Sequence, residues 1–312
     1  MIVQTVAAFG QSDVPPAQHR IAVMIDNITT PFGQQLKEGL EQAGQAHGFA
    51  VQVRAPVNDQ SNDQQVAILR EWEHAGFDIV MVRPRPGFED VFSAPILKLK
   101  EHGTKVITLI EPLPAGAATT CVAVDEETVN SVAAQKCAAV LQDGDEISVL
   151  RNSTPDGKLT VREQRIIRGL RERFPKLKMR MDRFMSTSND RRIDVAQAKA
   201  LIQSYPNLKV MYSAYTGASL ATIQALRETG KAGKIRHVCV GASLPLEAMQ
   251  AIEDGTVDVW IALLPKLVAY KAMDTAEDML AEKSVPPAVY GKVLVVTKEN
   301  LHTAEVEALY AK

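Results

Sequence analysis

Short apolar runs typical of strands alternate with amphipathic helical patterns along almost the whole chain of 312 residues. Alternation of this kind predicts βαβ units, in which parallel strands form a sheet that helices cover. In the first half, strands are expected at residues 21–25, 50–54, 79–82, 105–110 and 120–124, and helices at 31–47, 60–75 and 88–102. The chain is therefore expected to fold into the α/β class.

The same pattern starts again near residue 126. Its expected helices are 126–141, 161–174, 191–205, 217–229 and 246–254, and its expected strands are 146–151, 178–184, 210–213 and 237–241. Thr30, Asp125 and Thr160 each precede a predicted helix and are good N-caps. The repetition predicts two doubly wound lobes with a cleft between their strand ends, where ligands of open α/β sheets bind.

The composition limits the kinds of partner that the chain is expected to bind. The formal net charge of -2 gives no field that would attract nucleic acid, and no apolar run is long enough to insert across a membrane. Cys121, Cys137 and Cys239 are scattered without a C-x-x-C pair, so no metal site is expected. Two interpretations of the cysteines stay open, namely buried free thiols or a disulfide between Cys121 and Cys137.

Motifs for catalysis are missing from the sequence. There is no G-x-G-x-x-G, G-x-x-x-x-G-K-[ST], H-E-x-x-H or G-x-S-x-G motif, and the histidines stand singly. We therefore expect a binding protein without catalytic residues or a cofactor, and not an enzyme. Residues 1–19 combine a short apolar patch with a Pro-rich stretch but lack a basic start, which fits a trimmed secretory leader or a disordered tail.

Several segments, taken in order, resemble the type I periplasmic sugar-binding proteins, the family of the ribose-binding protein. They are IAVMIDNITTPFGQQLKEGL at 21–40, GTKVIT at 103–108, VAVD at 122–125, RGL at 168–170, VG at 240–241, AIEDG at 251–255 and IALLP at 261–265. Together they span about residues 20–298. The related lactose-repressor-like regulators carry a helix-turn-helix before the first strand, and the stretch before Ile21 is too short for one.

The resemblance implies two parallel-sheet lobes joined by three crossing segments, near residues 123–125, 262–265 and 288–292. It assigns 20–123 and 265–289 to the N-terminal lobe, assigns 124–262 and 290–312 to the C-terminal lobe, and places a strand at 291–296 by the hinge.

The resemblance also implies a function. It indicates a monomeric periplasmic receptor that closes on a small polar ligand, such as a sugar, a sugar derivative or an anionic polyol, and delivers it to the permease of an ABC transporter. The alternative is a ligand-sensing partner of a sensor kinase or chemoreceptor. A cytosolic enzyme or a detached regulator domain is a third hypothesis.

The first binding loop of the family corresponds to residues 29–33, which makes Thr30 and Phe32 candidate ligand residues. Phe32 keeps one stacking face for a sugar ring, whereas Gly33 lacks the second aromatic ring of the family motif. A core position at the start of the helix is equally open to Phe32. Asp26 follows the first strand, where its carboxylate either accepts a hydrogen bond from the ligand or caps the loop.

Other binding positions of the family fall on residues of different character. The clamp after the strand at 105–110 falls on Ile110 and Glu111, and Glu111 either binds the ligand or is solvated in a Pro-bounded turn. Two later strand-end loops supply Tyr215, Thr216 and Ser243 as further candidates. The polar set of a ribose site is thus nearly absent.

Arginines give the expected cleft a basic character. Arg83 follows a strand of the first lobe, Arg151 ends a strand of the second, and Arg162 and Arg165 open the next helix. Guanidinium groups suit carboxylates, phosphates or vicinal hydroxyls, so two that converge would favour an anionic ligand, while each alone also fits a surface position. Trp260 precedes a crossing and either closes over the ligand or packs between the lobes.

Overall fold

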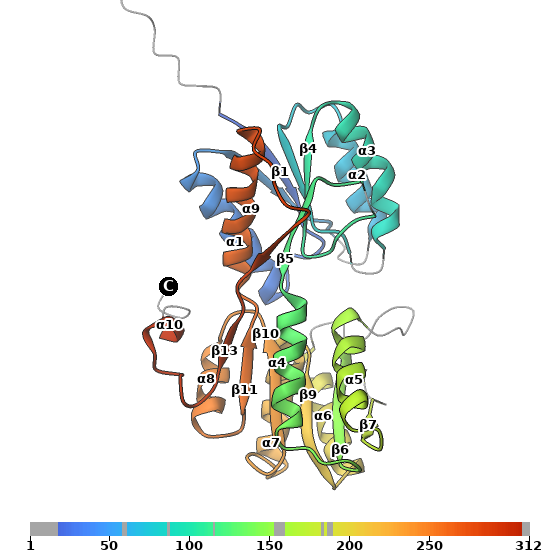
Figure 1. Cartoon of the computed structure of the whole chain (residues 1–312), viewed down its shortest axis with the longest axis vertical. Coiled ribbons are helices and arrows are strands. Elements are labelled where there is room, and N and C mark those ends of the chain that lie inside the picture. The colour runs from blue at the N-terminus through green and yellow to red at the C-terminus, as the bar shows by residue number, and fades with distance from the viewer. Residues whose placement is uncertain are drawn as a thin grey trace, which may run out of the picture.

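The computed structural model describes residues 18–57, 61–85, 88–114, 116–152, 160–181, 184–185 and 190–307. Within these ranges the chain forms two lobes, each built on its own sheet and stacked end to end (Figure 1). The prediction of an α/β fold with two parallel-sheet lobes is confirmed. Residues 1–17, where a leader or tail is expected, lie outside the described residues.

The first lobe contains a six-stranded sheet that is parallel throughout, in the order β12-β5-β4-β3-β1-β2. Its strands are β1 (Arg20–Met24), β2 (Ala50–Arg54), β3 (Ile79–Val82), β4 (Lys105–Leu109), β5 (Thr120–Val124) and β12 (Ala288–Gly291). Helices α1 (Pro31–Ala46) and α9 (Pro265–Leu280) pack on one face of the sheet, and α2 (Asn62–Trp72) and α3 (Ser93–Glu101) pack on the other.

The second lobe contains a sheet in the order β13-β11-β10-β9-β6-β7, with β8 beside β6. Its strands are β6 (Glu146–Asn152), β7 (Lys178–Arg180), β8 (Phe184–Met185), β9 (Leu208–Ser213), β10 (Arg236–Gly241), β11 (Val259–Ala262) and β13 (Leu294–Val296). Only the pairing of β13 with β11 is antiparallel among the described strand pairs of this sheet.

Helices cover both faces of the second sheet as well. One face carries α4 (Glu126–Ala138) and α5 (Val161–Arg173). The other face carries α6 (Arg191–Ser204), α7 (Thr216–Glu228), α8 (Leu246–Glu253) and the short α10 (Ala304–Glu307). The connections are those of a doubly wound fold, so the carboxyl ends of the parallel strands lie at the end of the lobe that faces the first lobe (Figure 1).

Three segments cross between the lobes, from β5 to α4, from β11 to α9 and from β12 to β13. Two predicted boundaries need correction, because Val124 pairs with Gly291 inside the first sheet and Tyr290 pairs there too. These residues were expected in the second lobe. The single strand expected at 291–296 is in fact the end of β12 and the whole of β13, which belong to different sheets.

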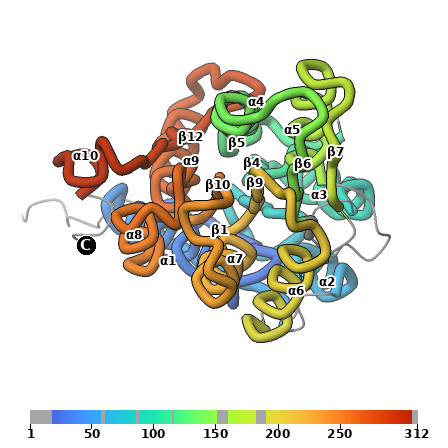
Figure 2. The backbone as a smooth tube through the Cα atoms, turned by 90° about the horizontal axis from the view of Figure 1, so that it is seen from below, coloured from blue at the N-terminus to red at the C-terminus, as the bar shows by residue number. Residues whose placement is uncertain are grey.

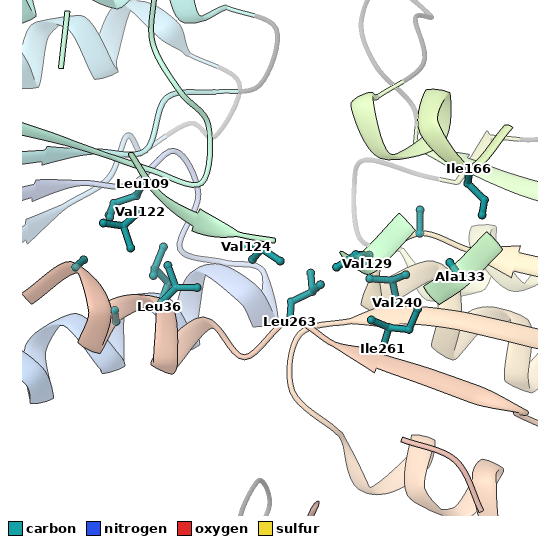
Figure 3. Packing of buried hydrophobic residues seen from close by; sticks show 14 of the residues in the cluster. Leu36, Leu109, Val122, Val124, Val129, Ala133, Ile166, Val240, Ile261 and Leu263 are labelled. Atoms are coloured by element: carbon teal, nitrogen blue, oxygen red, sulfur yellow. The ribbon is translucent and has the colours of Figure 1, made fainter. Parts of the chain in front are cut away.

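One apolar core runs through both lobes at the hinge. Figure 3 shows Val124 and Leu263 between the buried side chains of the first lobe and those of the second. Both side chains are almost completely buried, and each lies next to a crossing. The lobes therefore share apolar contacts at the crossings.

Helices α1 and α9 approach each other closely. A Cβ atom on Gly39 would lie 2.8 Å from the Cβ of Ala269 and 2.9 Å from the Cα of Lys266, so the helix backbones touch where glycine stands. Lys266 also forms an ion pair with Glu38 at 2.8 Å. Helix α1 thus packs firmly against α9, the helix that begins at the second crossing.

Two predicted elements differ in detail. The helix expected at 88–102 begins as a 3-10 turn, η1 (Glu89–Phe92), and continues as α3 from Ser93. Pro95 explains the break, because proline is tolerated only in the first turn of an α-helix. The strand expected at 178–184 consists of β7 and the first residue of β8, and residues 182–183 between them lie outside the described ranges.

Candidate functional site

A close backbone contact holds the loop between β1 and α1. Thr30 caps α1, and its side-chain oxygen accepts a hydrogen bond from the N–H of Gly33 at 3.1 Å. A Cβ atom on Gly33 would lie 1.9 Å from the carbonyl oxygen of Asn27. No side chain fits at residue 33, so the loss of the second aromatic ring follows from the shape of this loop.

Arg83 leaves the end of β3 and meets the β1–α1 loop. Its guanidinium forms an ion pair with Asp26 and lies 5.2 Å from the centre of the Phe32 ring. The side chains of Arg83 and Asp26 are only 15% and 12% exposed. Burial raises the pKa of Asp26, and the charge of Arg83 opposes that rise. Three predicted site residues, Asp26, Phe32 and Arg83, therefore form one cluster.

The buried side of this cluster is incompletely hydrogen-bonded. The amide of Gln65 donates to the sulfur of Met24 at 3.0 Å and to the carbonyl oxygen of Arg83 at 3.4 Å. Among the described residues, no group hydrogen-bonds the side-chain oxygen of Gln65 or the Nε of Arg83, and both atoms are buried. Unsatisfied buried groups of this kind mark a place where water or a ligand is expected.

Glu111 stands on a strained turn after β4. Its N–H donates to the carbonyl oxygen of Leu109 at 2.8 Å, across a γ-turn in which Ile110 has a φ of 69°. A positive φ is costly for a β-branched residue, and strain of this kind clusters at functional sites. The turn presents Glu111 where the two lobes meet.

The surroundings of Glu111 come from both lobes. Burial raises the pKa of its carboxyl most, Arg83 of the first lobe lowers it, and Glu126 and Arg162 of the second lobe also act on it. Among the described residues, no group donates a hydrogen bond to this carboxylate, although it is partly buried. The carboxylate of Glu111 is therefore a partly buried acceptor whose hydrogen-bonding capacity is not used by the described residues.

Arg162 forms the matching cluster in the second lobe. Its Nε donates to one carboxylate oxygen of Glu126 at 2.9 Å, and a terminal nitrogen reaches the other oxygen. The second terminal nitrogen donates to the carbonyl oxygen of Ala214 at 2.7 Å. The pair is bidentate and joins the first turns of α4 and α5 to the end of β9. We call the residues Asp26, Phe32, Arg83, Glu111, Glu126 and Arg162 the inter-lobe cluster.

Other predicted residues flank this cluster. The hydroxyl of Thr216 accepts from the N–H of Ala242 at 2.8 Å and so ties α7 to the end of β10. Tyr215 is half-buried, and burial raises the pKa of its hydroxyl, which keeps the proton. Arg165 is exposed on α5 near Asp125. The side chain of Arg151 lies outside what the structure describes, so its predicted role stays a prediction.

Ser243 and Trp260 have roles that the sequence did not indicate. The hydroxyl of Ser243 accepts a hydrogen bond at 2.8 Å from the amide of Gln35, which lies on α1 of the other lobe. Trp260 is completely buried in the core of the second lobe, where its indole N–H donates to the carbonyl oxygen of Ser243 at 2.7 Å. The expectation that Trp260 closes over a ligand or packs between the lobes is therefore wrong.

Sequence reasoning missed Glu126 and Gln35. Glu126 directly follows Asp125, the N-cap of α4, and Gln35 lies one turn after Thr30, the N-cap of α1. Glu126 is the first residue of α4 and Gln35 is the fifth residue of α1, and both helices follow strands of a sheet. The helix start signals were visible, but the arrangement of the lobes decides which of these residues meet.

The three cysteines are free and buried, so the interpretation with a disulfide between Cys121 and Cys137 is wrong. Within the described ranges, no group of three or more His, Cys, Asp or Glu side chains is arranged to hold a metal ion. Over the same residues, no helix has both the length and the apolar character needed to span a membrane.

Comparison with known proteins gives consistent matches. A family model described as "Periplasmic binding protein domain" matches residues 21–284. The ribose import binding protein RbsB of Escherichia coli is 20% identical over 269 residues, which are 86% of this chain and 87% of that protein. The D-allose-binding periplasmic protein of Escherichia coli is 22% identical over 288 residues, 89% of this chain and 87% of that protein.

Solved structures share the fold. An ABC transporter solute-binding protein from Agrobacterium vitis, bound with α-D-tagatopyranose, matches with a TM-score of 0.79 at 21% identity, over 95% of this chain and 100% of that chain. A second solute-binding protein from the same organism, with bound D-fucose, matches with a TM-score of 0.78 at 18% identity, over 93% of this chain and 99% of that chain.

Proposed function

The chain belongs to the periplasmic binding protein family, and on that premise we propose that it is a periplasmic receptor that binds a sugar between its lobes and delivers it to the permease of an ABC transporter. The relatives and neighbours named above include ribose, allose, tagatose and fucose binders. Their low identity to this chain leaves the particular sugar open, so the chemistry of the inter-lobe cluster has to indicate the ligand class.

The observation that carries the proposal is the position of Glu111. Glu111 follows β4 at the end of the first lobe that faces the second, and the charges of Arg83 in one lobe and of Arg162 and Glu126 in the other act on its carboxyl. A ligand that donates a hydrogen bond to Glu111 would contact residues of both lobes at once. Only such shared contact shifts an open–closed equilibrium toward closure.

The charges of the cluster favour an uncharged sugar over the anionic polyol considered from the sequence. Arg83 and Arg162 already pair with Asp26 and Glu126. An anionic ligand that took the place of one of these carboxylates would leave it buried without its partner, at a cost of about 3 kcal/mol or more. It would also face the carboxylate of Glu111. Sugar hydroxyls donate and accept, so they complement Glu111 without displacing either pair.

A monosaccharide screen tests the proposal. We expect at least one of ribose, allose, tagatose, fucose, arabinose and galactose to raise the melting temperature by roughly 5 °C at 100 times its Kd. Glucuronate and ribose 5-phosphate, added under the same conditions, are expected to give no shift. Isothermal titration calorimetry of the positive sugars then supplies the affinity.

Variants of two acidic residues separate site binding from a general charge effect. Glu111→Gln keeps the shape of the side chain but removes the charged acceptor, and we expect it to weaken sugar binding at least tenfold, or about 1.4 kcal/mol or more. Glu41→Gln, on the exposed face of α1, is the matched control and should leave affinity unchanged. If no sugar in the screen binds, the proposed function is wrong.

A further inference from the structure

One hydrogen bond among the described residues directly joins a side chain of α1 to a side chain of the β10–α8 loop. Gln35 lies on α1 of the first lobe, and its amide donates to the hydroxyl of Ser243 at 2.8 Å. Ser243 follows β10 of the second lobe. The two residues are 208 positions apart in sequence and are both partly buried. The bond therefore links the lobes with no ligand involved.

The conformation of Ser243 is held from within the second lobe. Ser243 has a φ of 51°, in the left-handed region that non-glycine residues rarely adopt. The buried indole N–H of Trp260 donates to its carbonyl oxygen at 2.7 Å and fixes the peptide. A Cβ atom on Gly241 would lie 2.3 Å from the Trp260 ring, so glycine makes room for that ring. The strained serine is thus supported by two residues of its own lobe, Trp260 and Gly241.

Gln35, the donor of this hydrogen bond, is also held in place by the packing of its own lobe. Helix α1 packs tightly on α9, and α9 begins at Pro265, directly after the crossing that follows β11. Trp260 is a residue of β11. Both ends of the Gln35–Ser243 bond are therefore connected to the same crossing, one through α1 and α9 and the other through Trp260.

We propose that the hydrogen bond between Gln35 and Ser243 is a latch that stabilises the present arrangement of the two lobes and so contributes to the balance between open and closed forms. A receptor whose binding-competent form is more populated binds its ligand more tightly in proportion. The latch would act on every ligand alike, because neither side chain needs to touch the ligand.

Distance measurements between spin labels test the latch without any ligand. Ala67 on α2 and Ala196 on α6 are exposed, and their helices belong to different lobes (Figure 1). Viewed along the long axis, α2 and α6 lie on the same side of the molecule (Figure 2). After Ala67→Cys and Ala196→Cys, labels attach at these positions, because the three natural cysteines are buried. Double electron–electron resonance then gives the populations of short and long distances between the lobes.

We expect Gln35→Leu and Ser243→Ala each to lower the population at the label distance of the present lobe arrangement, relative to the populations at other distances, about fivefold, the effect of losing one hydrogen bond. The double variant should shift no further than either single one, because both remove the same bond. Gln34→Leu, at the exposed neighbouring position, is the matched control and should match the wild type.

Two outcomes would overturn the latch. One is an unchanged distance distribution in both single variants, and the other is a double variant whose shift is the sum of the two. The two substitutions lie on opposite lobes and Ser243→Ala removes only a hydroxyl, so a folding defect in one variant leaves the other as a test. The measurement contains no sugar, and its outcome is therefore independent of the proposed sugar binding.

Discussion

The inter-lobe cluster contains two arginine–carboxylate pairs of similar burial, one in each lobe, that differ in how fully they are hydrogen-bonded. Arg162 reaches both oxygens of Glu126 and the carbonyl of Ala214. Arg83 reaches one oxygen of Asp26, stacks on Phe32 and leaves its buried Nε without a described partner. The second-lobe pair is extensively hydrogen-bonded, whereas the first-lobe pair has a buried donor that no described group accepts from.

This difference in hydrogen bonding predicts different roles for the two pairs. A saturated pair fixes helix ends before a ligand arrives, and its atoms gain little from the ligand. A pair with unsatisfied groups gains hydrogen bonds when a ligand or water reaches them. We therefore expect the second-lobe pair to contribute mainly to stability and the first-lobe pair to contribute mainly to binding.

The largest expected effect comes from removing the two arginines in turn. Arg162→Met should lower the free energy of unfolding by about 3 kcal/mol, because it strands Glu126 and the Ala214 carbonyl without donors. Arg83→Met should cost about half as much, because it strands Asp26 alone and burial already favours the protonated form of that carboxyl. Urea denaturation at pH 7 measures both values. Equal costs, or a larger cost for Arg83→Met, would break the comparison.

The next effect concerns one glycine in each lobe. Gly33→Ala should destabilise the protein by about 2.5 kcal/mol, because the new Cβ would meet the Asn27 carbonyl at 1.9 Å. Gly169→Ala is the matched control on α5, where the new Cβ would lie 3.8 Å from that of Ala134. It should stabilise the protein by about 0.5 kcal/mol, because alanine favours a helix over glycine. A neutral Gly33→Ala would show that the β1–α1 loop is adaptable after all.

Lowering the pH should destabilise the second lobe through a buried histidine. His237 is completely buried in β10, where it contacts the hydroxyl of Ser213 at 2.9 Å, and burial lowers its pKa to about 3. Because the unfolded state takes up this proton below its ordinary pKa of 6.5, the stability that His237 contributes is present above pH 6.5 and is lost as pH falls toward 3.

Between pH 7 and pH 5 this loss should be about 2 kcal/mol, measured by urea denaturation at each pH. His237→Gln should flatten the dependence in that range. His102→Gln, at an exposed histidine of the first lobe, is the control and should leave the dependence as it is. An unchanged slope in His237→Gln would assign the acid sensitivity to other groups.

The smallest expected effect concerns the helix caps on the two sides of the site. Thr30→Ala should cost about 1 kcal/mol, because one N–H at the start of α1 loses its acceptor. Asp125→Ala should cost slightly more, about 1.5 kcal/mol, because its carboxylate accepts from both the N–H and the hydroxyl of Thr128, at 3.0 Å and 2.6 Å. Thermal unfolding of the two variants side by side checks the order.

The sequence predicted the fold because strand and helix periodicities are local signals. It placed β1 to β5 and α1 nearly as observed, since buried parallel strands are short apolar runs and Thr30 and Pro31 mark a helix start. It failed where local signals compete. The strand expected at 291–296 reads as one apolar run, yet Gly291 and Leu294 pair in different sheets.

The residues of the candidate site were predicted less completely than the fold. The positions of Asp26 and Arg83 at strand ends made them candidates, and the structure pairs them, whereas Glu111 was a candidate only through the family resemblance. No rule of spacing shows that Trp260 faces inward, because that depends on the room Gly241 leaves for its ring. The pairing of Arg162 with Glu126 also depends on how α4 and α5 lie side by side, which sequence distance does not reveal.

A crystal structure of the chain with a sugar identified by the screen tests the central claim most directly. The account predicts that the sugar lies in the inter-lobe cluster, donates a hydroxyl hydrogen bond to Glu111 and contacts residues of both lobes, while the Arg162–Glu126 pair keeps its bidentate geometry. A sugar bound to one lobe alone, or bound away from Glu111, would contradict it.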